Sequence, residues 1–273
     1  MNEMELVRHR RSVRTFDGRA LSQEDADRLM ACAQSTENPY GLPIEFRLLS
    51  LSRDGLSTPV IIGADTFIAG RMRRVEHAEE AFGYAFETVV LEAERMGLGT
   101  TWIAGTMDRA AFEKAMDISE GYVMPCVSPV GYPARKMSVR ETMMRKGIRA
   151  DSRDAFSAIC FDRSFESPLT PEKAGALRDA LEMVRWAPSA VNRQPWRVIV
   201  DGKRVHFYEK KSRGFTDAQG WDIQKVDMGI AMCHFVRGVN MTGGKAAFML
   251  ADPGLHTPED TVYIASFETE SGV

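Results

Sequence analysis

Two stretches of the chain repeat apolar residues at helical spacing, and each follows a residue that can cap a helix. The apolar positions are Ala26, Leu29, Met30 and Ala33 in the first stretch and Ala174, Leu177, Leu181 and Val184 in the second. Ser22 and Thr170 precede them, and a Ser or Thr oxygen accepts hydrogen bonds from the free N–H groups of a first helical turn. We therefore expect amphipathic helices that begin at Ser22 and at Thr170.

Each predicted helix is followed by a loop rich in Pro, Asn and Ser and then by a strand-like run, at residues 44–51 and at residues 196–201. A longer apolar segment of helical character comes next in each case, at residues 81–97 and 226–240. Gly97 is suited to end the first of these helices, because glycine readily takes the left-handed conformation found there. The order helix, loop, strand, helix thus occurs twice.

Short motifs repeat at a matching interval. Residues 14–16, ArgThrPhe, recur as ArgSerPhe at residues 163–165, and Leu21 recurs with its polar neighbours as Leu169, so the copies lie 149 and 148 residues apart. Residues 144–157 are polar and charged, as is typical of a boundary between domains. The sequence therefore predicts an internal duplication. Its halves are residues 1–150 and residues 151–273.

Composition excludes several classes of protein. The 273 residues are 44% hydrophobic and 27% charged, which is typical of a globular chain. A net charge of −3 argues against the broad basic surface of a nonspecific nucleic-acid binder. Four dispersed cysteines without a CxxC pair, together with five histidines, indicate neither a disulfide framework nor a metal site.

The N-terminal segment carries charge throughout and lacks the apolar core of a signal peptide. Nowhere does the chain contain the run of about eighteen uncharged apolar residues that a membrane-spanning helix needs. We therefore expect a cytoplasmic protein with no membrane partner.

Two basic stretches are candidates for anion binding. Arg10, Ser12 and Arg14 alternate, so an extended segment would direct them to one side, where the arginines form a clamp for phosphate or carboxylate. Lys136 and Arg140 follow a predicted turn and are suited to a terminal phosphate. From the residues alone, a solvated, basic surface is the favoured interpretation of the first stretch, and it fits the second stretch equally well.

Glycines 97, 99 and 105 let the backbone approach a ligand closely. Trp102 breaks the GxGxxG spacing and the stretch follows a helix, so a dinucleotide-binding Rossmann domain is disfavoured. The same residues also fit a simple helix cap that leads into a buried strand at residues 100–105.

A polar loop after the second predicted helix carries Asn192 and Gln194, whose amides can read the edge of a flat heterocycle. Trp196 either covers an apolar wall there or belongs to the core. His234 lies in an apolar helical run and is expected to be a satisfied core residue. Sequence markers of common hydrolases, phosphoryl transferases and zinc proteases are absent, which favours chemistry performed by a cofactor.

Four blocks, taken in order, resemble the signatures of the nitroreductase family of flavoproteins. They are RRSVRTF from Arg10, GLGTTWIAG from Gly97, GYPARK from Gly131 and RWAPSAVNRQPW from Arg185. The resemblance implies an α+β, nitroreductase-like fold with a central sheet flanked by helices in each half. It also implies FMN, which members of the family bind between the two subunits of a homodimer. The present chain would then act as a pseudo-dimer, and further pairing between chains is compatible with this.

The resemblance implies a set of FMN-binding residues drawn from both halves. The set is Arg10, Ser12, Arg14, Ala104, Gly105, Lys136 and Arg140 from the first half and Pro188, Ser189, Ala190 and Asn192 from the second. The mirror-image positions lack these blocks, so the second half is expected to be degenerate and one FMN is expected per chain. Ala190 stands where many members carry Ser, and Arg135 where an acid is common, without loss of a group that flavin binding requires.

The activity implied is an oxidoreductase in which NADH or NADPH reduces FMN and a nitroaromatic, quinone or similar electron-poor acceptor then takes the hydride. The flavin performs the chemistry, and no catalytic side chain is expected. Three alternatives stay open: reductive dehalogenation or flavin breakdown on the same fold, a noncatalytic flavin-binding regulator, and, least favoured, a nucleic-acid or partner-binding module that uses the basic N-terminal segment.

Overall fold

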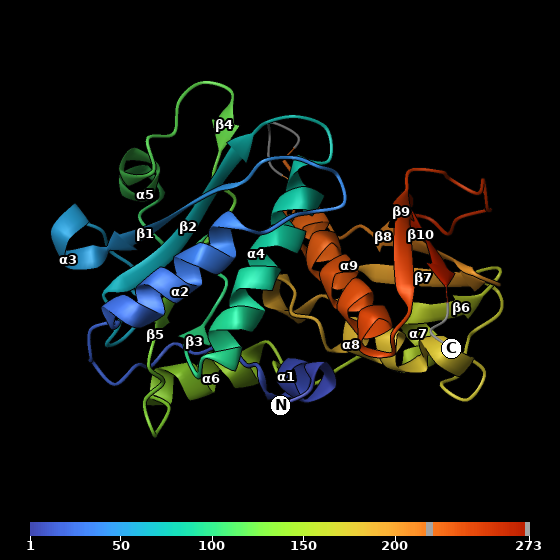
Figure 1. The fold of residues 1–273 in the computed structure, drawn as a ribbon, viewed down its shortest axis with the longest axis horizontal. Coiled ribbons are helices and arrows are strands. Elements are labelled where there is room, and N and C mark those ends of the chain that lie inside the picture. Colours follow the sequence, from blue (N-terminus) through green and yellow to red (C-terminus); the bar gives the residue numbers. More distant parts are fainter. Residues whose placement is uncertain (217–220, 271–273) are drawn as a thin grey trace. The chain divides into compact units, whose positions relative to one another are not determined.

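The computed structural model describes residues 1–216 and 221–270, and the chain divides into two compact units (Figure 1). Unit 1 comprises Met1 and Arg8–Ala150, and unit 2 comprises Asn2–Val7 and Asp151–Val273. Helix α1 (Glu3–His9) therefore begins in unit 2 and ends in unit 1, although the sequence placed all of it in the first half.

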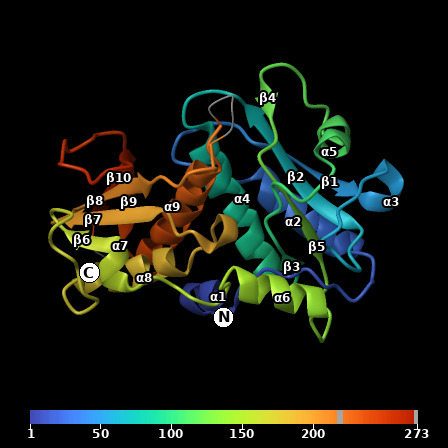
Figure 2. The same cartoon turned by 180° about the vertical axis from the view of Figure 1, so that it is seen from behind.

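Unit 1 is built on one antiparallel sheet. Its strands run in the order β1-β2-β5-β3, and β4 pairs with β2. The elements are α2 (Gln23–Gln34), β1 (Glu45–Ser50), α3 (Leu51–Asp54), β2 (Thr66–Arg73), α4 (Ala78–Arg95), β3 (Gly99–Thr100), α5 (Arg109–Ala115), β4 (Tyr122–Val123), β5 (Val127–Gly131) and α6 (Val139–Gly147). Helices α2 and α4 lie side by side against the strands β1 and β2 (Figures 1 and 2).

Unit 2 is built on a second sheet with the strand order β6-β7-β8-β10-β9, in which only the β6–β7 pair is parallel. The elements are α7 (Phe156–Ile159), β6 (Cys160–Asp162), the 3₁₀ helix η1 (Gly175–Leu177), α8 (Arg178–Trp186), the 3₁₀ helix η2 (Ala190–Asn192), β7 (Trp196–Asp201), β8 (Arg204–Lys210), α9 (Ile223–Met241), β9 (Lys245–Met249) and β10 (Thr261–Glu270). In its core Phe207 packs edge to face on Phe235 and on Phe267, whose own rings are tilted against each other.

The two units repeat one arrangement of elements. The order α2, β1, β2, α4, β3, β5 in unit 1 matches α8, β7, β8, α9, β9, β10 in unit 2. The spatial order of the matching strands is the same, β1-β2-β5-β3 and β7-β8-β10-β9, and every pairing among them is antiparallel. The predicted α+β class is confirmed.

Local signals at two helix ends are confirmed. Ser22 is the N-cap of α2, and its side chain accepts a hydrogen bond from the Asp25 N–H. After α4, Gly97 is left-handed at φ 76°, its N–H donates to the Glu94 carbonyl, and the Leu98 N–H donates to the Ala93 carbonyl. These two bonds satisfy carbonyls that the helix end leaves free.

The helix predicted to start at Thr170 starts later, at Arg178, so Thr170 is not its N-cap. Gly175 has φ 56°, a left-handed value that prevents a continuous α-helix from running from Thr170 through this position. Thr170 instead closes a turn, since its carbonyl accepts the N–H groups of Lys173 and Ala174.

The strand expected at residues 100–105 is also shorter than predicted, because β3 ends at Thr100. The next N–H, that of Thr101, donates to the Ser128 hydroxyl over 3.0 Å instead of to a strand carbonyl. The β-ladder therefore stops, and only Ile103 pairs again, through an isolated bridge to Val127.

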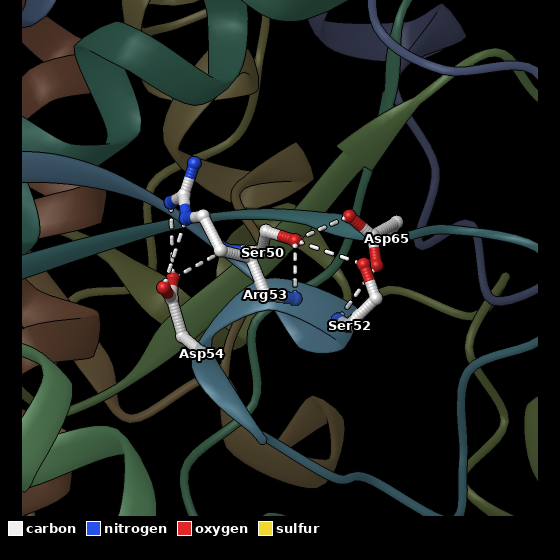
Figure 3. Close-up of polar contacts among 5 residues, drawn as sticks. All are labelled: Ser50, Ser52, Arg53, Asp54 and Asp65. Carbon is white, nitrogen blue, oxygen red and sulfur yellow. Dashed lines mark hydrogen bonds and ion pairs between the residues drawn. The ribbon is translucent and has the colours of Figure 1, made fainter.

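A short polar network holds the chain where β1 turns into α3 (Figure 3). Asp65 accepts hydrogen bonds from the Ser50 hydroxyl over 2.6 Å and the Ser52 N–H over 2.8 Å. Asp54 forms an ion pair with Arg53 and accepts a hydrogen bond from the Ser50 N–H over 2.8 Å. Both contacts lower the pKa of Asp54, and the contact with Arg53 has the larger effect. The network fixes both ends of the loop that leads into β2.

Among the residues that the structure describes, no helix is long and apolar enough to cross a membrane.

Candidate functional site

The segment from Ser12 to Phe16 is extended and is held on both sides within unit 1. The Val13 N–H donates to the Thr100 carbonyl over 2.8 Å, at the end of β3. On its other side, the Phe16 N–H donates to the Ile62 carbonyl over 2.8 Å, and the Ile62 N–H donates to the Arg14 carbonyl over 2.9 Å. The backbone that carries the predicted clamp is therefore fixed by its neighbours.

Arg14 in this segment and Arg10 just before it each have a buried nitrogen atom without a hydrogen-bond acceptor. These atoms are Nε of Arg10, which is 7% exposed, and Nη1 of Arg14. Burial lowers the pKa of both guanidinium groups, and Arg145 on α6 lowers it further, so all three positive charges lie near one another. A buried guanidinium N–H without an acceptor is costly, and an anion would supply the acceptor that is missing.

Helix α6 adds charge of both signs to this cluster. Its N-cap Ser138 is tied to the segment, because the Thr15 hydroxyl donates to the Ser138 hydroxyl over 3.0 Å. One turn further on, the buried Glu141 carboxylate lies 3.4 Å from Arg11, and Arg145 donates to the Ser12 carbonyl over 3.4 Å. Glu141 partly neutralises the arginines, and Arg145 extends the cation cluster.

Glu87 on α4 joins the arginine segment to the glycine-rich stretch. Its side chain is fully buried, with Oε1 at 4.0 Å from Arg10 Nε, while Oε2 accepts a hydrogen bond from the Trp102 indole over 3.1 Å. The Trp102 ring also packs on Phe86, with 4.8 Å between ring centroids. One carboxylate thus fixes both predicted ligand-binding stretches of unit 1.

Ala104 and Gly105 lie on a turn that Arg109 holds. The Arg109 guanidinium donates to the carbonyls of Ala104 and Met124, each over 2.8 Å, and to that of Pro125 over 3.2 Å. Within the described ranges, 1–216 and 221–270, the N–H groups of Ala104 and Gly105 donate to no other residue. They are therefore available to a ligand or to water.

Lys136 and Arg140 lie on the exposed surface at the start of α6. Arg140 donates to the Pro59 carbonyl over 2.5 Å. Among the described residues, neither Lys136 nor Arg140 forms a hydrogen bond with Ser12. In the same residues, neither of them shares a carboxylate partner with Arg10 or Arg14. The structure therefore groups Arg10, Ser12 and Arg14 with Arg145 rather than with these two cations, whose predicted role stays a prediction.

The candidate residues of unit 2 lie on a strained loop between α8 and β7. Val191, Asn192 and Gln194 have φ values of 44°, 60° and 51°, in the left-handed region. Such values are unusual outside glycine, and especially so for a β-branched valine. The loop needs strong local contacts to keep this shape.

Side chains of the loop supply some of those contacts. The Ser189 hydroxyl accepts the Gln194 N–H over 2.8 Å, and the Asn192 amide donates to the Ser152 carbonyl over 3.1 Å. Gln194 is buried, and its amide oxygen accepts the Asp154 N–H over 2.9 Å. Gln194 is therefore used to hold the chain and not to read a heterocycle, while Pro188 and Ala190 stay half-buried.

Trp196 and His234, which the sequence singled out in unit 2, both belong to its core. Trp196 is fully buried at the start of β7, as the core interpretation requires. His234 is also fully buried, and its Nδ1 hydrogen-bonds the Met183 carbonyl over 3.0 Å. The prediction that His234 is a satisfied core residue is confirmed.

Sequence reasoning missed four residues that organise these stretches: Glu87, Arg109, Arg145 and Asp227, which accepts the Ala190 N–H. Two of them carry a signal that the sequence shows. Glu80, Glu87 and Glu94 recur every seven residues along a largely apolar helix, and Asp227 is the sole acid of an apolar helical run. An acid placed on a buried helical face indicates a specific partner.

The fold and these buried charges define an α+β protein with a candidate anion site in unit 1. A family model described as "Putative TM nitroreductase" matches residues 2–239, and the chain belongs to this nitroreductase family. The predicted family and fold are confirmed.

One solved structure supports the fold over nearly the whole chain. A "putative nitroreductase" from Thermotoga maritima is 20% identical, and the match covers 98% of this chain and 94% of that chain with a TM-score of 0.62. Other matches cover about half of the chain. A "Putative NADH dehydrogenase/NAD(P)H nitroreductase" from Bacteroides thetaiotaomicron is 25% identical over 50% of this chain and 89% of that chain, with a TM-score of 0.43. An FMN-dependent nitroreductase from Clostridium difficile is 17% identical over 52% and 94%, with a TM-score of 0.42. No curated protein sequence gave a match.

Proposed function

We propose that this chain is an FMN-dependent NAD(P)H oxidoreductase that reduces nitroaromatic, quinone or similar electron-poor acceptors. Membership of the nitroreductase family supports a flavin oxidoreductase. The observation that carries the proposal is the pair of buried arginine nitrogens, Nε of Arg10 and Nη1 of Arg14, that lack an acceptor.

The phosphate of FMN fits this cluster. Arg10 and Arg14 would donate to its oxygens, the half-buried Ser12 hydroxyl would add a neutral donor, and Arg145 would contribute charge. The buried Glu141 and Glu87 limit the cost of gathering these cations before the anion arrives. The side chains of Lys136 and Arg140 are exposed, and they would reach the same phosphate when FMN binds.

Ala104 and Gly105 would donate their free N–H groups to the polar edge of the flavin ring. Arg109 keeps these donors in place through the Ala104 carbonyl, so they need no rearrangement on binding. When bound, FMN would supply the chemistry, accepting a hydride from NADH or NADPH and passing it to the acceptor. The chain's own contribution is to hold, orient and polarise.

Unit 2 would complete the FMN site with Pro188, Ser189, Ala190 and Asn192, so that one chain binds one FMN. The repeated order of elements and strands in the two units supports an internal duplication. At the matching positions the second copy reads CFDRSF in place of the block that carries Arg10, Ser12 and Arg14, which supports a degenerate second site.

Comparing FMN with riboflavin, which lacks the phosphate, tests the role of Arg14. Arg14→Ala should raise the Kd for FMN about 10- to 100-fold, the amount expected for a charged hydrogen bond, and leave the Kd for riboflavin within about twofold. Arg19→Ala is the control, because it removes the same charge at an exposed position, where Arg19 is hydrogen-bonded to Asp17. Equal loss of affinity for both ligands would place the phosphate elsewhere.

Turnover is tested by consumption of NADH and NADPH by the FMN-loaded protein, with menadione or a nitrofuran as acceptor. The proposal predicts steady consumption that requires both FMN and the acceptor, with Arg19→Ala close to wild type and Arg14→Ala impaired at limiting FMN. A protein that binds FMN tightly but consumes neither nucleotide would be a flavin-binding protein without this activity.

A further inference from the structure

The loop of residues 188–194 cannot keep its shape through local preference alone. Three of its non-glycine residues, Val191, Asn192 and Gln194, have left-handed φ values. Such a conformation is unfavourable for a residue other than glycine and persists only where surrounding contacts fix it. The contacts that fix this loop therefore decide whether its residues are ready for a ligand.

Asp227 on α9 makes a buried contact with this loop. Its two carboxylate oxygens accept the Ala190 N–H over 3.0 and 3.1 Å, and the residue is only 3% exposed. Among the described residues, the Ala190 N–H is the one hydrogen-bond donor to this carboxylate. Ala190 immediately precedes the three strained positions, so this bond fixes the start of the strained stretch.

The surroundings make an acid at this position expensive. Burial raises the pKa of Asp227 well above its ordinary value, the Ala190 N–H lowers it, and the nearby acids Asp222 and Glu209 raise it further. Those two acids are themselves buried. An apolar residue would avoid this cost, and the only compensation that the described residues offer is the bond to Ala190.

We propose that Asp227 is a positioning residue that fixes the Ala190 backbone and, through it, the loop of residues 188–194 in the shape that flavin binding requires. The inference rests on the proposed function for its effect on flavin, and on the Ala190 contact alone for its effect on the loop. Asp227 acts through Ala190 and touches no ligand itself.

Gln224, on the same helix, provides a matched control. It is buried like Asp227, and its amide oxygen accepts a backbone N–H, that of Ser212, over 2.6 Å. Gln224→Ala therefore removes a buried acceptor for a different loop from the same helix. Asp227→Asn keeps an acceptor oxygen for Ala190 and removes the charge, so it is the rescuing variant.

The experiment measures hydrogen exchange of the Ala190 amide by NMR on protein labelled with ¹⁵N-alanine, and the Kd for FMN and for riboflavin by fluorescence. In Asp227→Ala, the Ala190 amide should exchange at least about tenfold faster than in wild type, because its acceptor is lost. The Kd for FMN and for riboflavin should rise together, each about tenfold, because a loop that faces the flavin ring affects both ligands. Asp227→Asn should recover most of the protection and affinity.

Gln224→Ala should change Ala190 exchange and both Kd values by less than about twofold, even where its Tm falls as far as that of Asp227→Ala. Unchanged Ala190 exchange in Asp227→Ala would overturn the inference, and so would an equal loss of flavin affinity in Gln224→Ala. If the wild type binds no flavin, the proposed function fails, while Ala190 exchange still tests the link between Asp227 and the loop.

Discussion

Glu87 and Trp102 are joined by a partly buried hydrogen bond, in which the indole N–H donates to the Glu87 carboxylate over 3.1 Å. The same carboxylate faces Arg10 Nε at 4.0 Å. The arginine segment and the glycine-rich stretch of unit 1 therefore share one buried anchor on α4. Loss of its charge should disturb both.

Glu87→Gln should lower the free energy of unfolding by about 2–4 kcal/mol, because the buried Arg10 then loses the stronger of its two nearby opposite charges and keeps only Glu94. Urea unfolding of the flavin-free protein measures this. Glu120→Gln, at an exposed position, should change the value by less than about 0.5 kcal/mol. Because FMN would supply a substitute negative charge, a saturating concentration should restore part of the lost stability in Glu87→Gln. An unchanged unfolding curve would mean that Glu87 does not stabilise Arg10.

Gly99 is required by close packing in unit 1. A Cβ atom there would lie 2.8 Å from Cβ of Val13, closer than carbon atoms tolerate. Gly99→Ala should therefore displace the segment that carries Arg10 and Arg14, reducing stability by about 1–3 kcal/mol and weakening FMN binding.

Thermal unfolding and FMN titration of Gly99→Ala check this expectation. Gly147→Ala is the control, since a Cβ on Gly147 meets nothing within 4 Å, and it should be neutral. Adding Val13→Gly to Gly99→Ala should recover part of the FMN affinity, because it removes the Cβ and both Cγ atoms of residue 13 that the new Cβ would meet. If Gly99→Ala binds FMN as well as wild type does, the segment does not need its close contact with β3.

The buried acids of unit 2 predict a pH dependence of stability. Burial, and then the neighbouring Asp222, raise the pKa of Glu209 from its usual 4.5 to about 8, while Lys211 and Lys225 oppose this shift. The folded state therefore binds this proton more tightly than the unfolded chain does. The stabilisation is fully present below pH 4.5 and is lost as the pH rises through about 8.

Urea unfolding between pH 5 and pH 8 measures this slope, which one such group limits to about 1.4 kcal/mol per pH unit. The acids whose pKa is lowered, among them Asp25 and Asp54, titrate below this range and add no slope within it. Glu209→Gln should flatten the slope and leave the part due to Asp227, whereas Glu268→Gln, at an exposed position, should leave it unchanged. Equal slopes in wild type and Glu209→Gln would contradict the buried, proton-holding role of Glu209.

Local signals in the sequence predicted elements where one short-range interaction decides the outcome. Ser22 caps α2 and Gly97 ends α4 because each effect involves residues within one helical turn. Thr170 carries the same capping signal and fails, because Gly175 takes a left-handed conformation before the helix can form. Nothing in the capping motif reports on that glycine.

The candidate site divides in the same way. Arg10, Ser12 and Arg14 were predicted from their alternation and type, whereas Arg145 lies more than 130 positions away and reaches Ser12 only through the tertiary fold. Gln194 was expected to face a ligand, but its amide holds the Asp154 backbone, a use that residue type cannot distinguish from ligand binding. Sequence alone therefore located the stretches and missed the partners that fix them.

The central claim is that one chain binds one FMN. The visible absorption spectrum of the purified protein, before and after addition of FMN, tests this claim most directly. The bound flavin is then released and quantified per chain. The account predicts flavin bands and about one FMN per chain at saturation, since unit 2 lacks a second arginine clamp. About two FMN per chain would contradict the degenerate second site, and failure to bind FMN at all would contradict the proposed function.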